Sequence, residues 1–178
     1  MKIPRLILGN SNRRFSGVTS TMLQTLPEVH ALMPLVVLGT HHLPEKTPTI
    51  TFRELIKLND QPRIFHARRN DEMIQALAAR KLGANLKIVF TSTAQRHHSG
   101  FTRWLMNRMD GIITTCSAAE SYLKNKADVV IPHGIDLQRY SPPPSKQQAW
   151  KSLGFPGEFG IGIFGRVRPQ KGVDLLIG

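Results

Sequence analysis

Arg166 and Lys171 stand close together in the segment IFGRVRPQKG, residues 163–172. The guanidinium of Arg166 can make paired hydrogen bonds to phosphate oxygens, and Lys171 adds a point charge across the turn that contains Pro169. Fixed cations of this kind suit a diphosphate leaving group, on which negative charge develops during transfer. A basic turn is also compatible with a solvated loop. The spacing therefore makes Arg166 and Lys171 candidates for holding a diphosphate.

A second candidate anion site lies near the start of the chain, in GNSNRRFSGVTSTML at residues 9–23. Gly17 lets the backbone approach a ligand closely, because no side chain intervenes. A helical pattern follows, which Thr19 or Ser20 can cap and whose free N–H groups favour an anion. We expect this first helix to break early, at Pro27. The alternative for Gly17 is an ordinary tight turn.

Positive charge is the strongest overall feature, with 24 Lys and Arg against 12 Asp and Glu and a net charge of +12. Between Arg63 and Arg108, nine Lys and Arg stand against only Asp71 and Glu72. Such a stretch suits nucleic acid, an anionic membrane surface or a phosphorylated substrate, although scattered basic residues can serve solubility alone. The candidates for contact with an anionic acceptor are Arg96, His97, His98 and Arg103.

The histidines, the cysteine and the apolar segments mainly argue against particular functions. The seven histidines include adjacent pairs at residues 41–42 and 97–98, which lack metal-ligand spacing, so we expect no metal site. The single cysteine, Cys116, cannot form an intramolecular disulfide. No segment approaches the roughly 18 apolar residues of a membrane span, and no apolar signal region follows the twin arginine at residues 13–14. These features predict a cytoplasmic protein.

The elements that must position these residues are short apolar runs that alternate with helical patterns. The runs expected as strands are RLILGN (5–10), LVVLGT (35–40), RIFHA (63–67), KIVFTST (87–93), GIITTCS (111–117), DVVIPHG (128–134) and FGIGIFG (159–165). Several lack polar alternation, which predicts strands buried on both faces and separated by helices. We therefore expect an α/β fold with a doubly wound, mainly parallel sheet covered by helices on both sides.

Two helices stand out. Residues 70–83, NDEMIQALAARKLG, have Asn70 as an N-cap and Gly83 as a terminator. Their expected buried stripe is Met73, Ile74, Leu77 and Ala78. Residues 101–110, FTRWLMNRMD, form a second helix, whose apolar face is Phe101, Trp104, Leu105 and Met109. This face can pack on the core or rest on a membrane as part of a basic amphipathic helix.

Three consecutive prolines at residues 142–144 exclude helix and central strand and mark a linker. We expect residues 1–140 to form a Rossmann-like domain and residues 141–156 to form a Pro-rich linker. Residues 157–178 should begin a second, incomplete Rossmann-like domain with its first strand, turn and helix.

These residues also carry a family resemblance. VVIPHGIDLQRYSPPP, residues 129–144, followed by GIGIFGRVRPQKGVDLLI, resembles the interdomain passage of retaining glycosyltransferases of family 4, which have the GT-B fold of two Rossmann domains. In that family the matching arginine and lysine hold the diphosphate of a nucleotide sugar, which implies this role for Arg166 and Lys171. SGVTSTMLQTL resembles the family's glycine loop and first helix, which places Gly17 near the same diphosphate.

Residues 87–123 more narrowly resemble the mannosyltransferases of lipopolysaccharide core assembly. The resemblance implies GDP-mannose as donor, a Kdo-lipid as acceptor and peripheral contact with the inner membrane. No other cofactor and no metal are implied, because Arg166 and Lys171 can neutralise the diphosphate. The family's Glu-x7-Glu motif and nucleoside pocket would follow residue 178, so the chain is expected to be truncated and inactive alone.

We therefore expect part of a retaining hexosyltransferase that transfers mannose to a lipopolysaccharide core or related anionic glycolipid. The alternative is a basic module that binds nucleic acid or an anionic membrane surface without catalysis. Against nucleic acid, the sequence shows no helix-turn-helix, RRM or zinc-finger pattern, and only 7% of its residues are aromatic.

Overall fold

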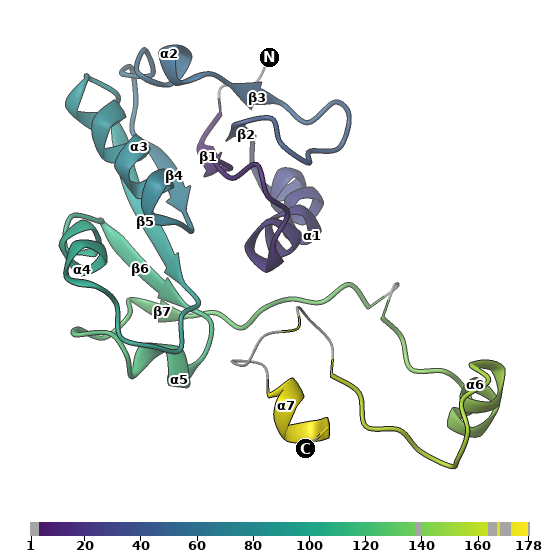
Figure 1. Ribbon diagram of the computed structural model, residues 1–178. Coiled ribbons are helices and arrows are strands. Elements are labelled where there is room, and N and C mark those ends of the chain that lie inside the picture. Colours follow the sequence, from purple (N-terminus) through teal and green to yellow (C-terminus); the bar gives the residue numbers. More distant parts are fainter. Residues whose placement is uncertain (1–3, 138–139, 164–166, 168–171, 178) are drawn as a thin grey trace. The chain divides into compact units, whose positions relative to one another are not determined.

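A computed structural model describes residues 4–137, 140–163, 167 and 172–177 (Figure 1). The chain divides into two compact units, Met1–Asp136 and Leu137–Gly178, which we call unit 1 and unit 2. The elements of unit 1 are β1 (Leu6–Gly9), α1 (Gly17–Leu32), β2 (Leu35–Leu38), β3 (Thr49–Ile50), α2 (Phe52–Leu55), β4 (Arg63–Ala67), α3 (Asn70–Lys81), β5 (Leu86–Ser92), α4 (Gly100–Met106), β6 (Gly111–Thr114), α5 (Ser117–Glu120) and β7 (Val129–Val130).

The strands form a single sheet in the order β3-β2-β1-β4-β5-β6-β7, and every neighbouring pair is parallel. The predicted α/β fold with a doubly wound sheet is therefore confirmed. β1 and β2 are buried along their whole length, as their unbroken apolar runs predicted. β4 and β5 instead alternate buried and more exposed residues, so one face of the sheet is less covered there.

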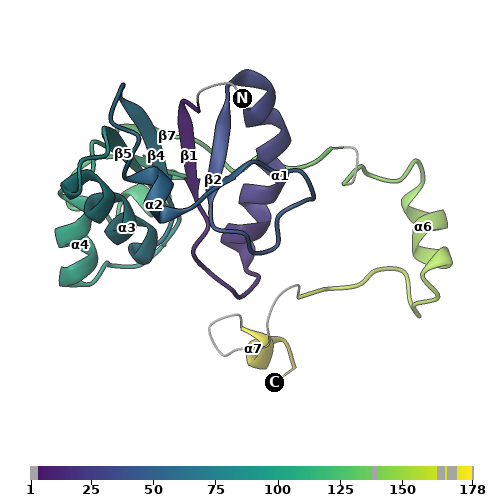
Figure 2. The same cartoon turned by 90° about the horizontal axis from the view of Figure 1, so that it is seen from above.

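Two apolar clusters cover opposite faces of the sheet. One packs α1 against β1 and β2 through Met22, Leu26, Leu6, Leu8, Leu35 and Val37. The other joins the strands to α2, α3 and α4, and its largest fully buried members are Ile7, Leu55, Phe65, Met73, Ile88 and Leu105. Figure 2 shows α1 on the other side of the sheet from α3 and α4. The strands are thereby held in register, with their carboxyl ends at a common edge.

Helix α1 differs from its predicted course in two respects. Its N-cap is Ser16, whose hydroxyl accepts a hydrogen bond from the Thr19 amide at 3.4 Å, so neither Thr19 nor Ser20 is the cap. The helix also does not break at Pro27, but continues through it to Leu32. Proline removes one backbone hydrogen bond, and the burial of Leu26 against the sheet compensates for that loss.

Helix α3 begins one residue earlier than predicted, with Arg69 at the N-cap position and no side-chain cap. Asn70 is not the cap, because its amide donates a 2.9 Å hydrogen bond to Thr102 Oγ1 of α4. The buried face is centred on Glu72, Met73, Ala76 and Ala79, whereas Ile74 is 45% exposed. The predicted buried stripe therefore lay partly on the wrong face of the helix. It omitted Glu72, which is the only polar residue that this helix buries.

Helix α4 buries Leu105 but leaves Phe101 and Trp104 about half exposed, at 55% and 49%. Its two aromatic rings stack at a centroid distance of 6.1 Å. The guanidinium carbon of Arg108 lies 3.7 Å from the centre of the Trp104 ring. Half of the predicted apolar face, Phe101 and Trp104, therefore lies on the surface, whereas Leu105 is buried and Met109 packs against the core.

Unit 2 contains α6 (Lys146–Ser152) and α7 (Val173–Ile177). Residues 142–144 are exposed, and α6 begins directly after them, inside the segment that the sequence suggested as linker. Ser145 caps this helix by accepting a hydrogen bond from the Gln148 amide at 3.3 Å. Residues 159–163 form no strand, contrary to expectation, because no neighbouring strand is available for them in the described part of unit 2.

Candidate functional site

The candidate site lies at the carboxyl edge of the sheet, where chain order reverses. β1 pairs with β2 on one side and with β4 on the other, so the connections after these strands diverge. In open parallel sheets, ligands bind in the crevice that such a divergence leaves. The residues that would border such a crevice here are those that follow β1 and those of the turn that joins β4 to α3.

Gly17 is the first residue of α1 and lies on one side of this crevice. A Cβ atom at Gly17 would meet no other atom within 4 Å, so the space outside it is open. The first turn of α1 contains no acidic residue that would neutralise the positive end of the helix dipole. This arrangement suits an anion, and the diphosphate role of Gly17 remains a prediction.

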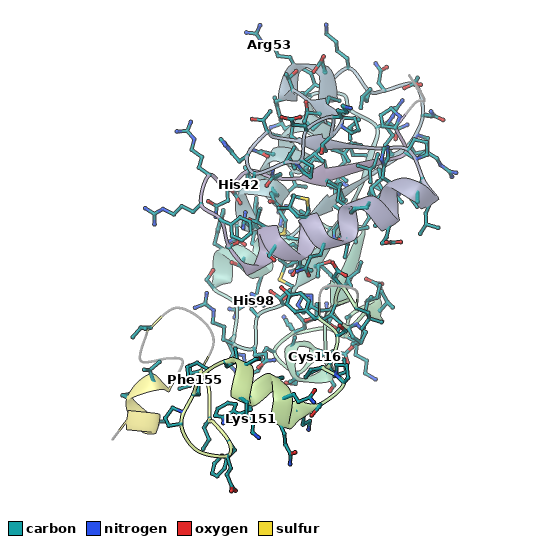
Figure 3. The ribbon with its side chains drawn as sticks, turned by 90° about the vertical axis from the view of Figure 1, so that its right-hand side faces the viewer. His42, Arg53, His98, Cys116, Lys151 and Phe155 are labelled. Atoms are coloured by element: carbon teal, nitrogen blue, oxygen red, sulfur yellow. The ribbon has the colours of Figure 1, made fainter. Side chains whose placement is uncertain are left out.

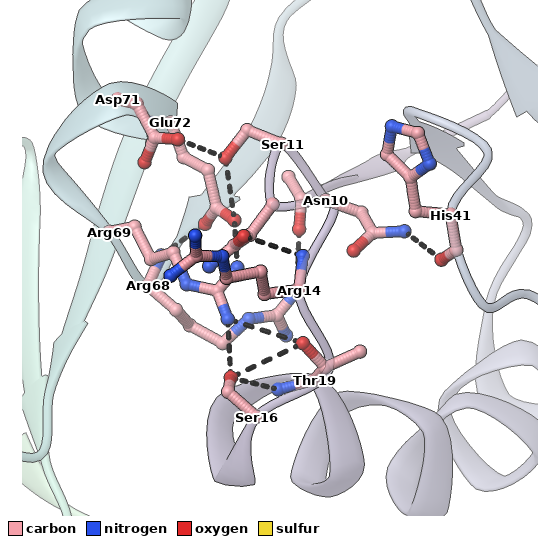
Figure 4. A network of polar contacts seen from close by, with 12 residues as sticks. Asn10, Ser11, Arg14, Ser16, Thr19, His41, Arg68, Arg69, Asp71 and Glu72 are labelled. Atoms are coloured by element: carbon pink, nitrogen blue, oxygen red, sulfur yellow. Dashed lines mark hydrogen bonds and ion pairs between the residues drawn. The ribbon is translucent and has the colours of Figure 1, made fainter.

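The β4–α3 turn is fastened to the β1–α1 segment by a polar network (Figure 4). The buried carboxylate of Glu72, 1% exposed, accepts a 2.7 Å hydrogen bond from the Arg68 amide and lies 3.9 Å from the Arg69 guanidinium. Arg68 donates to the carbonyl of Gly9 at 3.0 Å. A side chain at Gly9 could not be accommodated, because its Cβ would stand 2.9 Å from the Glu72 side chain.

The same network reaches the start of α1. One nitrogen of Arg69 donates to the hydroxyls of Ser16 at 2.6 Å and Thr19 at 3.2 Å (Figure 4). Arg68 and Arg69 are therefore held in fixed positions beside the first turn of α1. Sequence reasoning counted both arginines in the basic stretch but did not identify them as site residues. The available signal was their position directly after a buried strand of a parallel sheet.

A cavity of about 620 Å³ opens at the ends of β4 and β5. The residues that line it are Arg68, Arg69, Asn70, Phe90, Thr91, Ser92, Thr93, Ala94, Arg96, His97, His98, Ser99 and Thr102. The structure thus brings together three of the predicted acceptor residues, Arg96, His97 and His98. Arg103 does not line this cavity, but donates a 2.9 Å hydrogen bond to the carbonyl of His98 and borders a neighbouring groove.

Two histidines at this edge are held in the neutral form. Burial and the charges of Arg96 and Arg103 lower the pKa of His98, whose Nε2 lies 3.0 Å from the Ser92 hydroxyl. Burial and the charge of Arg68 lower the pKa of His66 to about 3. The ring of His66 lies 2.7 Å from Thr91 Oγ1, across the β4–β5 pair. Neither histidine therefore contributes positive charge at neutral pH.

Arg166 and Lys171 lie outside the described residues, so the structure does not place the predicted diphosphate grip. Among the residues that it does place, no three His, Cys, Asp or Glu side chains are grouped so that they could hold a metal ion. Within the described ranges, no helix combines the length and apolar character of a membrane span.

The architecture defines an α/β, Rossmann-like unit, and Arg68 and Arg69 lie at its switch point. A similar fold occurs in the crystal structure of Anabaena Alr3699/HepE in complex with UDP and glucose, with a TM-score of 0.67 over 97% of this chain and 56% of that one. Sequence identity is only 15%, so this likeness concerns the fold. No protein-family model matches the chain.

Closer relatives are found by sequence. The chain is 44% identical to the lipopolysaccharide core biosynthesis mannosyltransferase LpsB of Rhizobium meliloti (strain 1021), over 97% of this chain and 51% of that protein. It is 41% identical to LpcC of Rhizobium leguminosarum bv. viciae, which bears the same description, over 97% of this chain and 50% of that protein. The resemblance to lipopolysaccharide core mannosyltransferases is confirmed, and the chain spans about half the length of these relatives.

Proposed function

We propose that the chain is the acceptor-side half of a glycosyltransferase that transfers mannose from GDP-mannose to an anionic lipopolysaccharide core glycolipid, with retention of configuration. The observation that carries this proposal is the match to two lipopolysaccharide core mannosyltransferases over 97% of the chain. The cationic cavity at the ends of β4 and β5 supports it, because cations suit an acceptor that bears phosphate or carboxylate groups.

The donor diphosphate would be held from two sides. Gly17 offers an open helix N-terminus, and Arg166 with Lys171 would supply two cations. This arrangement neutralises the leaving diphosphate without a metal ion. Arg96, His97, His98 and Arg103 would contact the acceptor. The described residues therefore serve mainly acceptor binding, and the chain alone should not turn over substrate.

The direct test is a chimera in which residues 1–178 are joined to the part of LpsB that the chain does not match. We expect this protein to transfer mannose from GDP-mannose with the anomeric configuration retained. Arg166→Ala should lower turnover about a hundredfold, because a preorganised contact to the developing charge is lost. Lys171→Ala should act in the same direction, and the double variant should cost less than the sum, because both residues serve one diphosphate.

Lys151→Ala, at an exposed position of α6, is the control and should leave turnover unchanged. A chimera that uses UDP-glucose but not GDP-mannose would contradict the proposed donor, and an inverted product would contradict retention. In the same assay, Arg96→Glu together with Arg103→Glu should raise the KM for the acceptor and leave the KM for the donor nearly unchanged. Equal losses for both substrates would overturn the acceptor assignment.

We also propose that the protein works at the cytoplasmic face of the inner membrane, as a peripheral protein. The observation that favours this is the exposed aromatic pair of α4, Phe101 and Trp104, next to basic residues. Aromatic rings with flanking cations suit the boundary between headgroups and acyl chains. An anionic glycolipid acceptor would be met at that boundary.

A further inference from the structure

We propose that the cavity bordered by Arg68, Arg69 and Arg96 is an oxyanion-binding site that takes a phosphate or carboxylate group of the acceptor. The identity of the carrier rests on the proposed function, whereas the site itself rests on the geometry. The two arginines after β4 thereby become binding residues in addition to their part in the polar network. We refer to this cavity as the oxyanion site.

The charges around the oxyanion site are unbalanced. Three arginines are among its lining residues, and these residues include no Asp or Glu. Glu72 is the buried counter-charge nearby: it is paired with the Arg69 guanidinium, and its charge also acts on Arg68, whose backbone amide it binds. Asp71 is exposed and accepts a hydrogen bond from the Ser11 hydroxyl instead. An oxyanion in the cavity would therefore meet a net positive environment.

Burial of Arg68 strengthens this point. Burial lowers the pKa of the Arg68 guanidinium, the neighbouring charge of Arg69 lowers it further, and Glu72 opposes both effects. A charged group in this position is poorly solvated and only partly compensated. A bound anion would supply the missing counter-charge, which favours binding of an anion over binding of a neutral sugar.

The site is also preorganised. The contacts of Arg68 to Gly9 and of Arg69 to Ser16 and Thr19 fix both side chains before any ligand arrives. Arg69 uses one terminal nitrogen for Ser16 and Thr19 and holds the other 3.9 Å from Glu72, whereas the contact of the Arg68 guanidinium to Gly9 engages a single nitrogen. A guanidinium carries five N–H donors, so both side chains keep N–H groups that can reach an anion. Little side-chain entropy is then lost on binding.

Hydroxyl groups complete the lining. Thr91, Ser92, Thr93 and Ser99 border the cavity, and hydroxyls can donate hydrogen bonds to the oxygens that the arginines leave unbound. The neutral ring of His98 is bonded to Ser92 and adds no competing charge. The positive charge of the cavity therefore comes from the three arginines, which makes their substitution informative.

The experiment follows amide NMR shifts of the 178-residue protein during titration with inorganic phosphate and, separately, with galacturonate as a carboxylate-bearing sugar. We expect saturable shifts in residues 91–99 at millimolar ligand for at least one of the two. Arg96→Gln should weaken this binding about tenfold, because one charge-assisted contact is lost at an exposed position that the fold does not need. Arg69→Lys should also weaken it, because a point charge replaces the fork.

Arg53→Gln is the matched control, since Arg53 is an exposed arginine at the other end of unit 1 from His98 (Figure 3). Phosphate binding alone would assign the site to a phosphate group, and binding of galacturonate would assign it to a carboxylate. Absence of saturable shifts up to tens of millimolar, or equal effects of Arg96→Gln and Arg53→Gln, would overturn the proposal.

The chimera separates this proposal from the proposed function. If Arg96→Gln and Arg69→Lys leave transfer activity unchanged, the oxyanion site does not bind the acceptor. The proposed transferase function would still stand. An inactive chimera whose 178-residue half binds the oxyanion as described would contradict the transferase and leave the site in place.

Discussion

Glu72 is a buried carboxylate that two arginines share, and its removal tests how the β4–α3 turn is held. Glu72→Ala should lower the free energy of unfolding by about 3 kcal/mol, because Arg68 and Arg69 would keep their buried charge without a counter-charge. Urea denaturation followed by circular dichroism measures the change. The exposed neighbour Asp71→Asn should cost less than about 1 kcal/mol. Equal losses for the two variants would show that Glu72 is not the anchor of the turn.

His66 gives unit 1 a pH-dependent stability. Its pKa is about 3 in the folded protein, against an ordinary value of 6.5, so the folded state keeps it neutral while the unfolded chain binds a proton. The contribution of His66 to stability is therefore fully present above pH 6.5 and is lost as pH falls from 6.5 toward 3. One proton sets a slope of at most about 1.4 kcal/mol per pH unit.

The measurement is urea denaturation of the protein and of His66→Gln at several values between pH 7 and pH 4.5. The stability difference between the two proteins should shrink as the pH falls, because glutamine does not titrate. Comparing the two proteins at each pH cancels the carboxylates that also titrate at low pH. A constant difference across this range would show that folding does not lower the pKa of His66.

Among single residues, the sequence was most informative about a candidate site where the candidate residues are adjacent in the chain. Arg96, His97 and His98 are neighbours in the chain, and the structure places all three on one cavity. Arg68 and Arg69 were missed as site residues because their role depends on partners far away in sequence, such as Gly9 and Ser16. The placement of Arg166 and Lys171 remains a prediction from the family resemblance.

At the scale of elements, helix ends and buried faces departed most from expectation. Propensity suggested a break at Pro27 and a cap at Asn70, but packing of α1 on β1 and β2 and the bond from Asn70 to Thr102 decided otherwise. Strand β3 has only two residues, too few for a recognisable pattern. Tertiary contacts thus settled what local signals left open.

Helix α4 provides an element-scale prediction, because its exposed surface combines aromatic and basic residues. Phe101 and Trp104 stack on each other, and the adjoining groove of about 740 Å³ is bordered by Arg103, Lys124 and Lys126. Phe101→Ser with Trp104→Ser should reduce binding to vesicles of phosphatidylglycerol and phosphatidylethanolamine about tenfold, because apolar burial at the interface is lost. Cosedimentation at low and high salt measures binding, and added salt should weaken it.

The matched control for α4 is Phe159→Ser, which removes an aromatic ring that is 78% exposed in unit 2. This variant should bind these vesicles as strongly as the parent protein does. If the α4 double variant also binds like the parent, the aromatic face of α4 is not the membrane contact. Binding that is equally strong to uncharged phosphatidylcholine vesicles would contradict the role of the basic residues.

At the scale of the whole molecule, the alternation of buried strands with helices was sufficient to predict a parallel, doubly wound sheet. The strand order could not be predicted in the same way, because it depends on which side of β1 each crossover connection places the next strand. The position of the crevice follows from that order rather than from any motif. Function was inferred from short motifs, and the comparisons support the same assignment at the level of relatives.

The two units should differ sharply in stability, and this difference can be measured. Unit 1 has two apolar clusters on a seven-stranded sheet, whereas none of the described residues of unit 2 is buried. Among the described residues of unit 2, Trp150 packs against Phe155 with ring centres 5.6 Å apart. So small a contact cannot offset the backbone entropy of ordering the segment, at about 1–2 kcal/mol per residue. We therefore expect the unfolding transition of the chain to report unit 1 alone.

Shortening the chain to residues 1–136 should change the urea midpoint by no more than the experimental error. In the 178-residue protein, amide hydrogen exchange in residues 146–152 should be within about tenfold of the rate of an unfolded peptide, because opening there costs little free energy. Core amides of β1, β4 and β5 should exchange only with global unfolding. Slow exchange in α6, or a clear loss of stability on shortening, would show that unit 2 contributes to the fold in a way that its exposed side chains do not reveal.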